Sequence, residues 1–112
     1  IAKYYEIAAC KTLVLGSGST ELSDLGFIDK KTFVEIKENN YMEKVQYYLK
    51  REDLRNRITQ RGYEMVKKYH TTDRRVREFV DCILQYLGKE SIYYREPARK
   101  WVKTNGQISS GL

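Results

Sequence analysis

The early part of the chain switches between the apolar spacing of a helix and that of a strand. At its start, one helix face is marked by apolar side chains at i, i+3, i+4 and i+7, namely Ile1, Tyr4, Tyr5 and Ala8. Residues 12–15 then form a short apolar run that is ended by Gly16, which predicts a buried strand at residues 11–15. Residues 32–36 are rich in β-branched and aromatic side chains and predict a second strand. Because a short helical segment separates the two, we expect adjacent parallel strands in an α/β fold.

After residue 40 the spacing predicts a mostly helical chain, with helices at residues 40–49, 52–69 and 72–87. The first of them begins like a capping box, in which the side chains of Asn40 and Glu43 bond free backbone N–H groups. Gly62 lies inside the second and lowers its stability by about 1 kcal/mol relative to alanine. We therefore expect a neighbouring element to approach the backbone closely at Gly62.

The third of these helices has the most regular apolar face of the chain. Its apolar positions repeat with helical spacing as far as Leu87, and Gly88 is a suitable C-terminal stop. We expect this face to be buried against the sheet or the preceding helices, through Val76, Phe79, Val80, Ile83 and Leu84. Phe79→Ala would then lower the free energy of unfolding by about 3–5 kcal/mol.

Composition and charge place the chain among globular proteins. It has 112 residues, of which 41% are hydrophobic and 32% charged, so there is room for one domain with a modest core. The net charge of +6 permits an anionic partner, although a basic bias on mixed-sign helix surfaces is the simpler explanation for most of it. Cys10 and Cys82 favour a reduced chain inside the cell. No apolar run is long enough to span a membrane.

Glu6 is the clearest candidate for ligand binding, because it lies just off the apolar face of the first helix. A carboxylate there stays in contact with water and can accept two hydrogen bonds from paired hydroxyl groups. The start of the same helix, at Lys3 and Tyr4, presents free N–H groups to an anion, and Lys3 adds a positive charge. On spacing alone, the simpler interpretation of Lys3 and Glu6 is an ordinary solvated helix surface.

The other candidate motifs are weaker. The loop at residues 16–19, Gly-Ser-Gly-Ser, joins a strand to a helix as phosphate-binding loops do, but it lacks their remaining fingerprint residues. A flexible connection is the simpler interpretation. His70, the single histidine, falls at a helix end, and we expect it to make a C-terminal cap interaction rather than act as a base. We predict no catalytic residue, no metal site and no cofactor.

Three segments carry a resemblance to a known family, namely Tyr5-Glu6-Ile7-Ala8-Ala9-Cys10, Asp24-Leu25-Gly26-Phe27 and Phe33-Val34-Glu35-Ile36. Over residues 1–87 the chain resembles the donor half of group 1 glycosyltransferases, the GT-B enzymes built from two Rossmann-like domains. Within that group it is most similar to the spore-maturation glycosyltransferase-like branch. The resemblance implies the C-terminal part of a Rossmann-like, nucleotide-sugar-binding domain with a parallel sheet.

The resemblance also implies roles for residues at the start of the chain. Glu6 matches the glutamate that binds the ribose of a nucleotide sugar, and Lys3 matches a basic position that usually holds arginine. Together with Tyr4, these residues would bind a nucleoside diphosphate sugar, the donor of the transferred sugar. Lys11 stands where the family has glycine.

The family's acceptor domain and the first strands of its donor domain would precede Ile1. We therefore expect a piece of a glycosyltransferase that is inactive alone, with the N-terminal acceptor domain of the same protein as its partner. The expected location is the cytoplasm, with peripheral attachment to a membrane as the second choice.

Residues 88–112 are predicted to form a separate basic tail with three aromatic anchors, Tyr93, Tyr94 and Trp101. This tail could dock on the acceptor domain, bind an anionic surface or stay disordered. The alternative function of the whole chain is a non-enzymatic basic helical module that binds nucleic acid or a partner protein. The arginines of the helix at residues 52–69 are spread around it, so nucleic acid is the less favoured partner.

Overall fold

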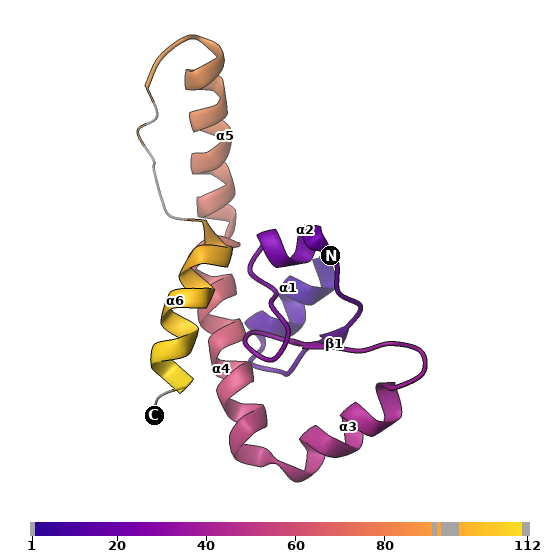
Figure 1. Cartoon of the computed structure of the whole chain (residues 1–112). Helices are drawn as coiled ribbons and strands as arrows, with labels where there is room; N and C mark the ends of the chain where they lie inside the picture. The colour runs from indigo at the N-terminus through magenta and orange to yellow at the C-terminus, as the bar shows by residue number, and fades with distance from the viewer. Residues whose placement is uncertain (1, 91, 93–96, 111–112) are drawn as a thin grey trace.

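The computed structural model describes residues 2–90, 92 and 97–110. These residues form helices around two short strands (Figure 1). In chain order the elements are α1 (Ala2–Ala9), β1 (Leu15–Gly16), α2 (Thr20–Asp24), β2 (Val34–Glu35), α3 (Tyr41–Lys50), α4 (Glu52–Tyr69), α5 (Thr72–Tyr86) and α6 (Ala98–Ser110). The predicted α/β class, mostly helical after residue 40, is confirmed.

The two strands are adjacent and parallel, as predicted, in the register Leu15 to Val34 and Gly16 to Glu35. Both are shorter than the predicted ranges. The N–H of Thr12 still donates to the carbonyl of Ile7 at 3.3 Å, so the chain leaves α1 late. Sheet bonding begins at Val14, whose carbonyl accepts from the N–H of Val34 at 2.9 Å.

Helices α3, α4 and α5 begin and end within one residue of their predicted ranges. The predicted capping box at the start of α3 is wrong, because the Asn40 side chain makes no bond to the helix. Its Oδ1 instead accepts from the N–H of Lys37 at 2.8 Å, a local turn that competes with capping. At the other end of α3, Arg55 Nη1 donates to the carbonyls of Tyr48 and Leu49 at 2.7 and 3.0 Å. These bonds add a side-chain donor to carbonyls at the C-terminal end of the helix.

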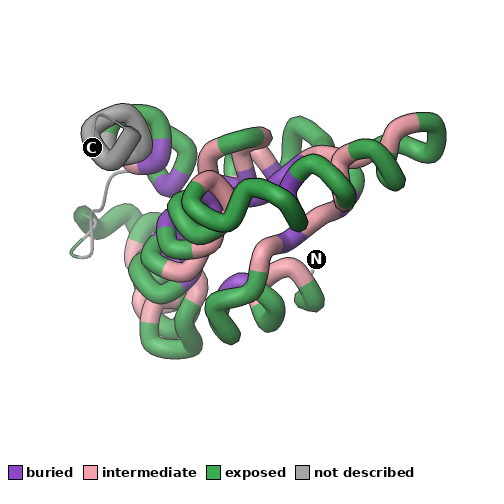
Figure 2. The backbone as a smooth tube through the Cα atoms, turned by 90° about the horizontal axis from the view of Figure 1, so that it is seen from below, coloured by how far each residue is buried: buried purple, intermediate pink, exposed green. Residues whose placement is uncertain are grey.

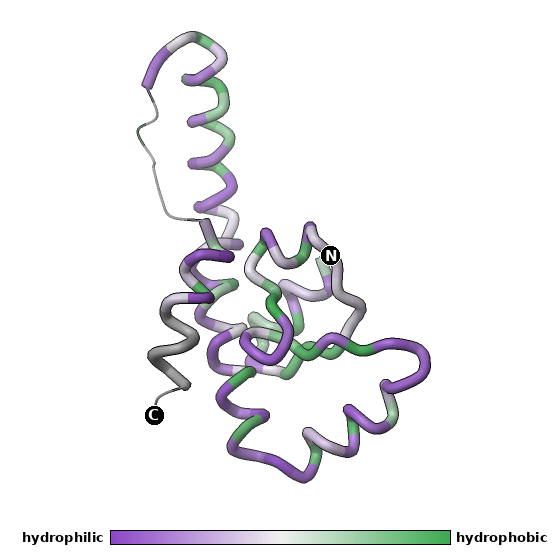
Figure 3. Tube along the Cα trace, in the orientation of Figure 1, coloured by the Kyte–Doolittle hydropathy of each residue, from purple (hydrophilic) through white to green (hydrophobic). Residues whose placement is uncertain are grey.

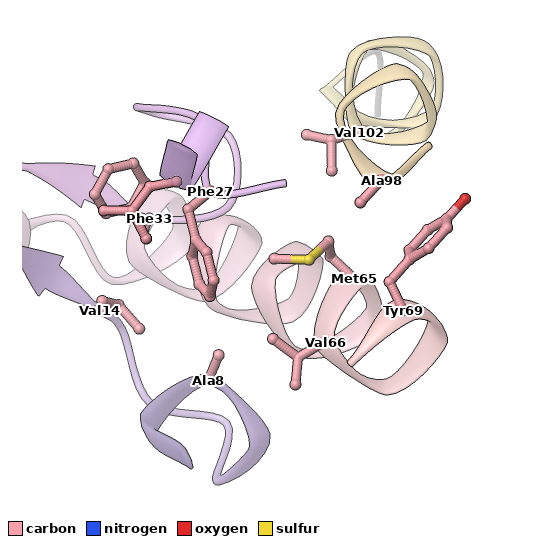
Figure 4. Packing of buried hydrophobic residues seen from close by; sticks show 10 residues of the cluster. Ala8, Val14, Phe27, Phe33, Met65, Val66, Tyr69, Ala98 and Val102 are labelled. Atoms are coloured by element: carbon pink, nitrogen blue, oxygen red, sulfur yellow. The ribbon is translucent and has the colours of Figure 1, made fainter. Parts of the chain in front are cut away.

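The main core lies between α4 and the segments around it. Helices α1, α3 and α6 all contact α4, and the buried positions of α4 lie between Ile58 and Tyr69. Figure 2 shows where buried positions lie along the backbone. Side chains from several elements converge there (Figure 4): Ala8, Val14, Phe27, Phe33, Met65, Val66, Tyr69, Ala98 and Val102. From the predicted tail, α6 joins this core through Ala98 and Val102, while Trp101 packs against its rim. Tyr93 and Tyr94 lie outside the described residues.

Gly62 lets α4 approach the chain just before β2, and the predicted close approach at this glycine is confirmed. A methyl group added to its Cα would lie 2.6 Å from the carbonyl oxygen of Thr32. Thr32 itself is fixed, because its hydroxyl donates to the carbonyl of Gly26 at 2.6 Å and accepts from the N–H of Ile28 at 2.9 Å. The carbonyl of Thr32 therefore has little freedom to move away from α4.

The predicted burial of the α5 face is wrong. No residue of α5 is buried, and the side chains of Val76, Phe79 and Ile83 are 55%, 67% and 45% exposed. Helix α5 projects beyond the rest of the molecule (Figure 1), and hydrophobic positions recur along it (Figure 3). Apolar spacing identifies a helix and its apolar face, but it carries no information about what covers that face.

Replacing Gly62 with alanine should destabilise the fold. Glycine to alanine inside a helix normally gains about 1 kcal/mol. Here the added methyl would meet the Thr32 carbonyl, so we expect a net loss in the free energy of unfolding measured in urea. The exposed Asn56 of the same helix provides the control, since Asn56→Ala should leave stability unchanged or raise it. A gain in Gly62→Ala similar to the control would contradict the close approach.

Two phenylalanines allow the buried core and the projecting helix to be compared by mutation. Phe33 is 1% exposed and Phe79 is 67% exposed. In dilute solution we expect Phe33→Ala to lower the free energy of unfolding by about 3–5 kcal/mol. Phe79→Ala should lower it by less than about 0.5 kcal/mol. Equal losses in the two variants, measured by the same urea titration, would show that the α5 face is covered within one chain.

Candidate functional site

Tyr4 holds the start of α1 against the loop that follows β1. Its hydroxyl donates to the carbonyl of Ser17 at 3.1 Å, and its ring packs edge-on against Phe27 with centroids 5.7 Å apart. The ring also fills the space beside Gly16, where no Cβ would fit. The N-terminal end of α1 is thereby placed at the carboxyl edge of the parallel strands, which is where open α/β sheets bind ligands.

Lys3 and Glu6 are both exposed on α1. They are three residues apart, so their side chains emerge close together on one side of the helix. Among the described residues, neither side chain has a hydrogen bond or an ion pair. A cation and a carboxylate are therefore both available to a ligand at this end of the helix. Tyr4, the third predicted site residue, has its hydroxyl engaged with Ser17.

The loop at residues 16–19 is less suited to phosphate than its composition implies. The carboxylate of Glu35 lies directly against the Cα of Gly18, leaving no room for a side chain there. A negative charge in that position repels a phosphate group. The hydroxyl of Ser19 is also engaged, because it accepts from the N–H of Leu22 at 3.1 Å and caps α2. Glu35 was not a predicted site residue, although it is a polar residue at the end of a predicted strand.

The chain turns after α1 at Lys11, where the resemblance expects a glycine. Its φ is 56°, in the left-handed region that favours glycine. Its Nζ lies over the Tyr63 ring, 4.6 Å from the centroid. This cation–π contact offsets part of the backbone cost, because such contacts stabilise by about 0.5–1 kcal/mol at exposed sites.

His70 joins α2, α4 and α5. It follows the last residue of α4, and its N–H donates to the carbonyl of Val66 at 2.8 Å. The imidazole turns away from α4: its Nε2 donates to the carbonyl of Leu25, the residue that ends α2, at 2.6 Å. Its Nδ1 accepts from Arg75 Nη2 at 2.6 Å. The predicted location at a helix end is confirmed, but the ring caps α2 rather than its own helix.

Burial holds His70 neutral. Desolvation lowers the pKa of its imidazole, the positive Arg75 lowers it further, and the Leu25 carbonyl and Glu78 oppose the shift. The ring of Tyr5 stacks on the imidazole with centroids 4.5 Å apart. With both nitrogens engaged and one face covered, His70 is part of the packing and is poorly placed to act as a general base.

Three hollows on the described surface contain neither Lys3 nor Glu6. One of about 410 Å³ lies between α3 and α4 and contains Lys44 and Tyr48. Burial raises the pKa of the Tyr48 hydroxyl, and the nearby Asp29 adds to the shift. Another of about 480 Å³ lies at the base of α5 beside His70. Within the described residues there is no group of three metal-ligating side chains and no helix long and apolar enough to cross a membrane.

A known family accounts for most of the chain. The profile of a family described as glycosyl transferase-like matches residues 2–81. The chain belongs to the glycosyl transferase-like family. Comparisons with curated proteins and with solved structures gave no match. Family membership supports a role in glycosyl transfer in general terms.

The matched region of this glycosyl transferase-like chain runs from the start of α1 into α5. It includes the three predicted site residues at the start of α1 and both strands, whereas α6 lies beyond it. The part of the chain common to the family therefore contains the carboxyl edge of the sheet and the helix whose N-terminal end lies there.

The stability of the chain should depend on pH through His70. The folded state binds a proton less readily than the unfolded state, whose histidine has the ordinary pKa of about 6.5. The free energy of unfolding should therefore be level above about pH 7 and fall as the pH drops below about 6.5. His70→Gln, whose amide can make both bonds, should flatten the curve between about pH 7.5 and 5.5. An unchanged slope in this variant would contradict the assignment.

Proposed function

We propose that this chain is the donor-binding part of a GT-B glycosyltransferase of group 1, in the spore-maturation glycosyltransferase-like branch. The enzyme would transfer a sugar from a nucleoside diphosphate sugar to an acceptor. One observation carries the proposal: Lys3 and Glu6 are exposed, and unpartnered among the described residues, on a helix whose N-terminal end lies at the carboxyl edge of two parallel strands. The coarser glycosyl transferase-like assignment comes from the family match over residues 2–81.

Two parts of the proposed donor, the ribose and the diphosphate, have groups suited to them in this chain. The two adjacent hydroxyls of a ribose can donate to the two oxygens of Glu6. The diphosphate suits the free N–H groups at the start of α1 and the positive charge of Lys3. That charge would become more important as the leaving diphosphate gains negative charge. Tyr4 serves the site by fixing α1 on Ser17, so the two charged residues are held in place.

In this proposal, the chain forms only part of the donor domain of the enzyme. Residues 1–87 would form the C-terminal part of a Rossmann-like donor domain, and residues 88–112 a basic tail. The surface for the base and the acceptor domain would lie elsewhere in the full protein, and the chain alone would not catalyse transfer. We assign no catalytic residue, metal or cofactor to it. The proposed location is the cytoplasm, with peripheral attachment to a membrane as the second choice.

A basic module that binds nucleic acid is supported less well. Arg55 donates to the carbonyls that end α3, and Arg51 stacks on the Tyr47 ring with its guanidinium carbon 3.7 Å from the centroid. Arg61 is buried, and burial lowers its pKa. These arginines are used in the fold and do not form one exposed stripe for a phosphate backbone.

In the full-length protein, Glu6→Gln should weaken binding of a nucleoside diphosphate sugar by about 1–3 kcal/mol, because a charge-assisted bond to the ribose becomes neutral. Lys3→Ala should reduce turnover at least as much as binding. Nucleotide titration by calorimetry and sugar-transfer kinetics measure the two effects. Glu52→Gln is the control, since Glu52 is exposed at the start of α4, outside the proposed site. Unchanged donor affinity in a folded Glu6→Gln protein would refute the proposal.

A further inference from the structure

The projecting helix α5 carries a large apolar face that no described part of the chain covers. Its members repeat with helical spacing and cover about 140° of the helix circumference. Phe79 and Leu87 are 67% and 60% exposed, while Val80 and Leu84 are half-buried. The exposed members are Val76, Phe79, Ile83 and Leu87. An apolar surface of this extent marks an interaction site.

The contacts that described residues outside α5 make with this helix lie on its polar sides. At the base of the helix, Arg75 bonds His70 and the carbonyl of Tyr69, so this side faces the body of the protein. Farther along, Asp81 accepts from the N–H of Ile92 at 3.0 Å, so the returning chain lies beside Asp81. Both residues flank the apolar face. Within the described residues, that face points away from the chain's own core.

A helix in this position needs a partner surface that buries its apolar face. Helices of about this length are marginal in water when isolated, and burial of the apolar face supplies most of their stability in proteins. The ion pair Arg77–Asp73 at 3.1 Å is exposed, and such pairs contribute little. The helix therefore gains its stability mainly where its apolar face meets a partner.

We propose that this partner is α5 of a second copy of the chain, packed antiparallel across a two-fold axis. In the antiparallel orientation, apolar side chains of one copy lie opposite apolar side chains of the other. If the two helices cross between Phe79 and Val80, each Val76 lies opposite Ile83 of the second copy. In the same register, Thr72 lies opposite Leu87 of the second copy, and the large Phe79 side chains fill the centre beside the smaller Val80.

Charge favours the same orientation. The N-terminal half of α5 has three arginines against two acidic residues, a net charge of +1: Asp73, Arg74, Arg75, Arg77 and Glu78. Asp81 is the single charged residue of the C-terminal half, with a net charge of −1. Antiparallel packing places each basic half beside an acidic half, and it also opposes the two helix dipoles. A parallel pair would place like charges together.

The area of the face is at the lower limit of what a specific pair needs. Two such faces would bury on the order of 1,000 Å², the lower limit for a specific interface. We therefore expect a weak, reversible dimer that dissociates on dilution. The bodies of the two copies would lie at opposite ends of the paired helices, since α5 projects beyond the rest of each chain (Figure 1).

Sedimentation equilibrium from about 1 to 200 µM tests self-association. Phe79→Glu should raise the dissociation constant at least about 30-fold, because Phe79 is the central side chain. Gln85→Glu is the matched control: it introduces the same residue on the opposite, polar side of α5 and should leave dimerisation nearly unchanged. A urea titration checks that both variants keep the buried core around α4. A wild-type chain that stays monomeric and folded across this range would overturn the proposal.

Cross-linking tests the orientation separately. In a background with Cys10→Ser and Cys82→Ser, one preparation would carry Val76→Cys and another Ile83→Cys. A short bismaleimide should join the two preparations when they are mixed, as antiparallel packing requires. Efficient joining of Val76→Cys to itself, without the mixed product, would show a parallel pair and overturn the proposal. This test requires no sugar nucleotide, so its outcome is independent of the proposed donor site.

Discussion

The contact between Gly62 and the carbonyl of Thr32 fixes the distance between α4 and the strands in the core. Helices α1, α3 and α6 all pack against α4. The distance between α4 and the strands therefore decides where these three helices can lie. A side chain at Gly62 would push α4 away from β2 and open the space that Phe27, Phe33 and Met65 now fill. Since close-packed interiors tolerate little change in volume, the loss would extend beyond the point of contact.

The same spacing positions the candidate site. Tyr4 can reach the Ser17 carbonyl only while its ring rests on Phe27 and Phe33, which the α4 contact holds in place. The exposed Lys3 and Glu6 follow from that anchoring, because α1 has one face committed to the core. The charged groups offered to a ligand are therefore placed by an aromatic cluster beneath them and make no ion pair among the described residues.

Sequence patterns predicted the strands and the long helices well, but they predicted poorly which groups surround individual side chains. The spacing of apolar residues predicted the strands and the long helices, because this spacing is a property of the local sequence. The spacing of Asn40 and Glu43 fits a capping box, but a competing turn at Lys37 took the asparagine side chain. The partners of His70 are far away in sequence, so no local pattern could have placed its ring on Leu25. Glu35 escaped notice because only the fold brings it onto Gly18.

The separate position of α5 gives the chain two levels of stability. The core around α4 opens only when the whole chain unfolds, whereas α5 has no buried residue and can unwind while that core stays intact. Its amide hydrogens should exchange with solvent far faster than those of α4, and the three arginines in its first half offer early cleavage points to trypsin. A chain of 112 residues thus behaves as a stable body with a helix that folds and unfolds on its own timescale.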